Sequence, residues 1–149
     1  MLFRSAPQVK DIEILVATKC MIQRNVFDGN IQYFPETEKI SWVEYLGAKS
    51  QIKGGQRFKQ FMLNEGIKLD LFIVFDPSQW GVQLVIRTGP AEFSRKVVTS
   101  KVLGRYLLPG YKVTGGHLET NGGEIISTPS EKSFFKYLTI DFIPPGDRQ

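Results

Sequence analysis

The stretch Val9-Lys-Asp-Ile-Glu-Ile-Leu-Val16 (VKDIEILV) alternates charged and aliphatic side chains near the start of a chain of 149 residues. Alternation with a period of two predicts a β-strand over residues 9–17. On such a strand the isoleucines share one face with Val16, whereas Asp11 and Glu13 share the other. Two carboxylates this close repel each other unless a cation lies between them.

A second segment, Lys68–Val74 (KLDLFIV), is also predicted to be a strand, and it carries Asp70 among aliphatic neighbours. If this strand pairs beside the first, Asp70 joins Asp11 and Glu13 as a third carboxylate on one sheet. Carboxylate oxygens suit Mg²⁺, which keeps waters and recruits substrate phosphates to complete its ligand shell. The alternative is that all three are ordinary acids on the wet face of amphipathic strands, and spacing alone leaves both interpretations open.

Composition predicts one compact domain with a small attached subdomain. The chain is 42% hydrophobic, and no apolar run approaches the roughly 20 residues that span a bilayer. With one cysteine, Cys20, and one histidine, His117, it can form neither an intramolecular disulfide nor a Cys/His zinc cage. We therefore expect a cytoplasmic protein that does not bind membranes and that holds any metal through carboxylates.

Positive charge is concentrated in the second half of the chain. The formal net charge is +4 and the pI is about 9.2. Between Arg87 and Lys112 the only acid is Glu92. This distribution favours an anionic partner such as nucleic acid or nucleotide. The cations of this range are Arg87, Arg95, Lys96, Lys101, Arg105 and Lys112.

The remaining segments predict a mixture of helices and strands. In the first half they are an irregular excursion or hairpin over 20–36, a helix over 38–46, and strands over 50–53 and 57–63 joined by Gly54-Gly55. In the second half they are a helix near Trp80 capped by Asp76 or Ser78, a helix over 91–105 with Pro90 before it, an antiparallel meander over 110–127 with His117 in an exposed loop, and a helix over 130–138.

Four segments together resemble a known family in their order and spacing. They are VKDIEILV, KLDLFIV, Trp80–Arg95 (W-G-V-x-L-x-x-R-T-G-P-A-E-F-S-R) and Ser130–Arg148 (S-E-K-S-F-F-K-Y-L-x-x-x-F-I-P-P-G-D-R). In these the chain resembles, over nearly its whole length, the palm and thumb of the DNA polymerase X family, the DNA polymerase beta-like nucleotidyltransferases. Its bacterial and phage-encoded members look most similar. The last two segments are more specific than the acidic pair.

The resemblance implies an α+β fold. Residues 1–88 would form a nucleotidyltransferase-type palm sheet with flanking helices, and residues 89–149 a small α/β thumb subdomain. Asp11, Glu13 and Asp70 match the catalytic, metal-binding carboxylates of the family, which bind Mg²⁺ or Mn²⁺. The implied activity is the addition of nucleotides from a nucleoside triphosphate to a DNA 3′-hydroxyl, as in DNA repair.

Further site residues follow from the same resemblance. Those that match nucleotide-binding positions are Arg4, Thr88 and Gly89. Those that match or lie near positions that contact nucleic acid are Arg87, Ser94, Arg95 and Lys101. Two features depart from the family pattern. Glu13 replaces the commoner aspartate, and Ile86 and Arg87 replace aromatic residues that gate the sugar.

A Gly-Ser dipeptide that cradles the triphosphate in the family would fall at or before Met1, counting back from Asp11. We therefore expect an incomplete phosphate cradle in this chain, with weaker nucleotide binding because charge-assisted hydrogen bonds are lost. Two alternatives follow. The chain is a non-catalytic, nucleic-acid-binding remnant of such a polymerase, or a partner protein or a second copy supplies the cradle.

Overall fold

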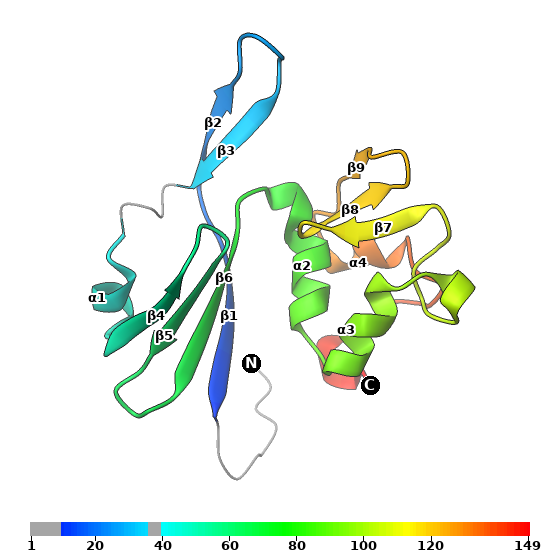
Figure 1. The fold of residues 1–149 in the computed structure, drawn as a ribbon. Coiled ribbons are helices and arrows are strands. Elements are labelled where there is room, and N and C mark those ends of the chain that lie inside the picture. The colour runs from blue at the N-terminus through cyan, green and yellow to red at the C-terminus, as the bar shows by residue number, and fades with distance from the viewer. Residues whose placement is uncertain (1–9, 36–39) are drawn as a thin grey trace. The chain divides into compact units, whose positions relative to one another are not determined.

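The computed structural model describes residues 10–35 and 40–149, and for residues 20–23 and 31–35 it describes the backbone alone. Internal contacts divide the chain into two compact units, Met1–Asp76 and Pro77–Gln149. Each unit combines helix with sheet, so the predicted α+β class is confirmed (Figure 1). Within the described part of the chain, no helix is long and apolar enough to cross a membrane.

Unit 1 is built on a four-stranded sheet in the order β1-β6-β5-β4. The central strand β6 (Lys68–Val74) pairs in parallel with β1 (Asp11–Ala17) and antiparallel with β5 (Phe58–Met62). The edge strand β4 (Ser50–Gly54) forms the predicted hairpin with β5. A parallel pair requires a long crossover connection, and the segments between β1 and β6 supply it.

The apolar face of this sheet carries the core of unit 1. Leu69, Leu71 and Ile73 alternate along β6 and are buried together with Phe61 of β5 and Trp42. Trp42 begins α1 (Trp42–Leu46), which ends at Gly47 in the left-handed conformation that glycine adopts without strain. The helix predicted over 38–46 is confirmed from residue 42 onward, and residues 36–39 lie outside the described ranges.

The segment that was predicted to be irregular or a hairpin is a hairpin. β2 (Cys20–Arg24) pairs antiparallel with β3 (Ile31–Pro35). In the turn, the Asn25 N–H donates to the Asn30 carbonyl at 2.8 Å, and the Phe27 N–H donates to Asn25 Oδ1 at 3.0 Å. The side chain of Phe27 is 97% exposed at the tip.

Unit 2 packs short helices with a three-stranded antiparallel sheet, in the strand order β7-β8-β9. Its elements are α2 (Trp80–Arg87), α3 (Ala91–Val98), β7 (Tyr111–Thr114), β8 (His117–Thr120), β9 (Ile125–Ile126) and α4 (Glu131–Phe135). Their buried residues are Val82, Val85, Phe93, Val97, Leu107, Leu118, Phe134, Phe135 and Leu138.

The start of α2 differs from the prediction in two respects. Its N-cap residue is Gln79, with no side-chain cap, rather than Asp76 or Ser78. The predicted palm, residues 1–88, also includes this helix, whereas Val82 and Val85 bury it in the core of unit 2. The division between the units therefore falls after residue 76, because the apolar face of α2 packs with the later helices.

The helix predicted over 91–105 ends at Val98. Thr99 is extended, with φ −111° and ψ 138°. Its carbonyl accepts the N–H of the buried Leu107 at 3.0 Å, and the Leu107 carbonyl accepts the Lys101 N–H at 2.6 Å. Three consecutive β-branched residues end the helix, and β-branching disfavours helix. Lys101 consequently lies on a 3-10 turn outside α3.

Gly81 allows α2 to approach the segment that precedes α4. Its N–H donates to the Thr128 carbonyl at 2.7 Å, and a Cβ at this position would lie 2.0 Å from the Ser130 carbonyl oxygen. Any larger side chain here would therefore collide with backbone that is itself hydrogen-bonded.

We expect Gly81→Ala to destabilise unit 2 by about 1–3 kcal/mol, because overpacking outweighs the gain in helix propensity of about 1 kcal/mol. Urea unfolding followed by circular dichroism measures the loss. The matched control is Gly122→Ala, where the nearest atom would be Thr120 Oγ1 at 3.7 Å. Equal stability of the two variants would contradict the close approach.

Candidate functional site

The register of β1 and β6 brings three acids to one face of the sheet. Glu13 is the Cα partner of Asp70, and Asp11 is the partner of Lys68. Partners on adjacent strands point to the same side, and so do residues two apart on one strand. Asp11, Glu13 and Asp70 therefore share the face opposite the apolar core. Asp11 and Glu13 are exposed, and Asp70 is half-buried.

Strand β5 extends this acidic face. Gln60 is the Cα partner of Asp70, and its Nε2 donates to Asp70 Oδ1 at 2.8 Å. In the next row, the rings of Phe58 and Phe72 lie 5.1 Å apart. The face thus has three rows across β1, β6 and β5: Asp11, Lys68 and Met62; Glu13, Asp70 and Gln60; Leu15, Phe72 and Phe58.

The capacity of this face to hold a metal ion depends on side-chain positions. In residues 10–35 and 40–149, no three His, Cys, Asp or Glu side chains form a group that could hold an ion. Glu13 and Asp70 are nevertheless direct neighbours on strands about 4.8 Å apart. The backbone register permits a shared ion, and an exposed side chain such as Glu13 can change rotamer without disturbing the sheet.

Two of the predicted nucleotide-binding residues belong to unit 2, and the third, Arg4, lies outside the described residues. Thr88 is the C-cap of α2, and its hydroxyl donates to the Leu84 carbonyl at 2.6 Å. Gly89 has φ +121°, a conformation that side chains rarely adopt. A Cβ on Gly89 would also lie 3.2 Å from the Cβ of Arg148.

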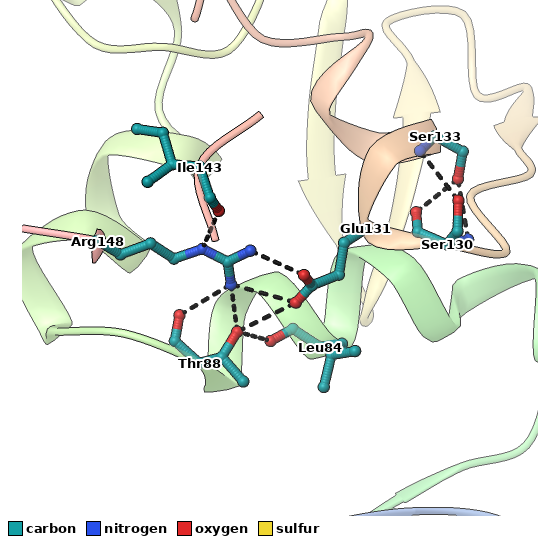
Figure 2. A network of polar contacts seen from close by, with 7 residues as sticks. All are labelled: Leu84, Thr88, Ser130, Glu131, Ser133, Ile143 and Arg148. Atoms are coloured by element: carbon teal, nitrogen blue, oxygen red, sulfur yellow. Dashed lines mark hydrogen bonds and ion pairs between the residues drawn. The ribbon is translucent and has the colours of Figure 1, made fainter. Parts of the chain in front are cut away.

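Arg148 is the centre of a buried polar network in unit 2 (Figure 2). Its guanidinium forms a bidentate ion pair with Glu131, with Nη2–Oε2 at 2.8 Å and Nη1–Oε1 at 3.2 Å. It also donates to both the hydroxyl and the carbonyl of Thr88 and, through Nε, to the Ile143 carbonyl at 3.0 Å.

Aromatic rings complete the surroundings of this guanidinium. Its carbon lies 5.6 Å from the ring centre of Phe93 and 5.5 Å from that of Phe135, within the range of cation–π attraction. Glu131 is held in the first turn of α4, where the side chains of Ser130 and Ser133 form a reciprocal cap. Residues of the segments Trp80–Arg95 and Ser130–Arg148 therefore meet in one network.

The residues predicted to contact nucleic acid have different environments. Ser94 is turned inward, and its hydroxyl donates to the Ile86 carbonyl at 2.6 Å. Arg87, Arg95 and Lys101 are exposed. The Arg95 side chain is 73% exposed and lies 3.7 Å from Glu92. These exposed cations can reach phosphates, whereas Ser94 stabilises the junction of α2 and α3.

His117 was predicted to lie in an exposed loop, and this was wrong. It begins β8, and its Nε2 lies 2.7 Å from Glu119 Oε2. Lys112 Nζ lies 2.9 Å from the other oxygen of the same carboxylate. Hydrogen bonds from His117 and then Lys112 hold the pKa of Glu119 below its ordinary value. The pattern H-x-E within a strand was the sequence signal for this pair.

Comparison with protein-family models and with characterised proteins finds no match for this chain. The resemblance to polymerase X enzymes therefore rests on the motifs quoted above.

We expect Arg148→Met to destabilise unit 2 by about 3–5 kcal/mol, because it leaves the Glu131 carboxylate buried without its partner. Combining it with Glu131→Gln removes the orphaned charge and should recover part of the loss. The control is Arg105→Met, since Arg105 pairs with the half-exposed Glu92 and such pairs contribute about 0–1 kcal/mol. Equal losses for the two arginine variants in urea unfolding would contradict the buried role.

The contacts of Glu119 with His117 and Lys112 predict that unit 2 loses stability in acid. Since the folded-state pKa of Glu119 is lower than its unfolded value of 4.5, its stabilising contribution is present above about pH 4.5 and is lost as the pH falls through the folded pKa. The stability difference between the wild type and Glu119→Gln should therefore shrink from about pH 6 to about pH 3. Urea unfolding at several pH values across this range measures the stability difference. A difference that stays constant would contradict the lowered pKa of Glu119.

Proposed function

We propose that this chain is a metal-dependent nucleotidyltransferase of the DNA polymerase X type, acting in the cytoplasm on a nucleoside triphosphate and a DNA 3′-hydroxyl. The observation that carries the proposal is the register that sets Glu13 beside Asp70, with Asp11 on the same sheet face. Acids from two segments far apart in the sequence thus share one surface, as the chemistry requires.

The carboxylates of this face are the type of ligand that a hard divalent cation prefers. Asp11, Glu13 and Asp70 would hold Mg²⁺ or Mn²⁺, which when bound would neutralise charge that develops on the transferred phosphate. The fit rests on donor chemistry and strand register.

Asp70 has a further role in this proposal. Its carboxylate would accept the proton of the 3′-hydroxyl, so that this oxygen can form a bond to the α-phosphorus while the bond to the leaving pyrophosphate breaks. The half-buried position of Asp70 and its hydrogen bond to Gln60 restrict the carboxylate, as a proton acceptor requires. The exposed Arg95 and Lys101 of unit 2 would bind phosphates of the nucleic acid.

A second candidate function is nucleic-acid binding without catalysis. It is favoured by the finding that no group of three potential ligands in the described ranges could hold a metal ion. The exposed cations of unit 2 would serve this function equally well. The two candidates differ in nucleotide incorporation.

We expect the chain to extend a DNA primer in the presence of Mg²⁺ or Mn²⁺, and Asp70→Asn to lower the rate by about 10²–10⁴-fold, because the proton acceptor is lost. Gel-based primer extension measures the rate. The control is Glu65→Gln, which removes an exposed carboxylate in the turn between β5 and β6. DNA binding without incorporation would favour the non-catalytic function, and activity in the Asp70 variant would exclude the proposed site.

A further inference from the structure

We infer that Gln60 is a positioning residue that fixes the carboxylate of Asp70, an inference that rests on the function proposed above. Gln60 and Asp70 face each other across β5 and β6, and Gln60 Nε2 lies 2.8 Å from Asp70 Oδ1. Both residues are half-buried, in the two middle strands of the sheet.

The contact distinguishes the two oxygens of Asp70. A carboxylate can rotate about its last side-chain bond, which has a broad torsional preference. The hydrogen bond to Oδ1 opposes this rotation and leaves Oδ2 to accept a proton or contact an ion. Within the described ranges Asp70 is the only member of the acidic trio with a side-chain hydrogen bond, since none joins Asp11 or Glu13 to another described residue.

The chemical nature of the donor also matters. A carboxamide donates without carrying a charge, so Gln60 orients the carboxylate and leaves its full negative charge available. A lysine or arginine at this place would pair with Asp70 and compete with a metal ion for it. Removing a residue that hydrogen-bonds to a metal ligand commonly changes metal affinity or activity by about 10–100-fold.

Gln60 has neighbours along its own strand and on both adjacent strands. Its neighbour two residues earlier on β5 is Phe58, whose ring contacts Phe72 of β6 at 5.1 Å between centres. On its other side Gln60 has Lys53 of β4 as Cα partner, next to the register shift of that strand. Phe58 therefore lies on the same sheet face as Gln60, in the next row along the strand.

The test compares Gln60→Met, which keeps the length of the side chain and removes the donor, with the wild type. We expect the Mn²⁺ affinity, measured by electron paramagnetic resonance on the full chain, to fall about 10-fold or more. In primer extension kcat should fall by a similar factor, while KM for the nucleoside triphosphate should stay within about twofold, because Gln60 acts through Asp70. The control is Gln51→Met, on the exposed edge strand.

The outcomes separate this inference from the proposed function. If the wild type incorporates nucleotides and Gln60→Met equals it in Mn²⁺ affinity and kcat, the positioning role of Gln60 is overturned and the proposed function stands. A wild type that neither incorporates nucleotides nor binds Mn²⁺ overturns both. Urea unfolding of both variants measures their stability and serves as the fold control. If Mn²⁺ affinity and kcat fall in the Gln51→Met control as well, in proportion to lost stability, Gln60 has a structural role only and the inference is overturned.

Discussion

The parallel pairing of β1 with β6 is the constraint on which the proposed site depends. Residues from the two ends of unit 1 become neighbours only through this register, which matches Glu13 with Asp70. A shift by one residue would send every side chain of β1 to the opposite face. The apolar residues of both strands oppose such a shift, because it would bring Ile14 and Val16 out of contact with the core.

The two faces of this sheet therefore have separate tasks. The apolar face binds α1 through Trp42 and supplies the stability of the unit. The polar face carries the acids, Gln60 and an aromatic pair, in rows that cross three strands. Polar groups on this second face cost little stability, since antiparallel and mixed sheets tolerate one face toward water. Residues that bind a ligand or react can therefore lie on this face without disturbing the core.

In unit 2, two sequence motifs form part of the interior rather than an exposed face. The Thr-Gly turn after α2 and the Ser-Glu-Lys start of α4 converge on Arg148, which is fully buried. Burying an arginine is costly unless its donors are satisfied, and here Glu131, Thr88 and Ile143 receive them. In this chain these motifs thus contribute to the internal packing of unit 2.

By itself the sequence determined the four strands of the β1-β6-β5-β4 sheet and the shared face of Asp11 and Glu13, because a period of two residues is set by local backbone geometry. It left β2 and β3 open, as an irregular excursion or a hairpin. It failed for the end of α3, where β-branched residues and a bridge between Ser100 and Leu107 compete with helix formation. Only the tertiary structure decided which distant residues meet, such as Gln60 with Asp70 and Arg148 with Glu131. Nothing in the short-range pattern around Gln60 or Arg148 distinguishes them from exposed polar residues. The contacts of Gln60 and Arg148 follow from strand register and core packing. Both depend on which distant segments pack together rather than on local sequence.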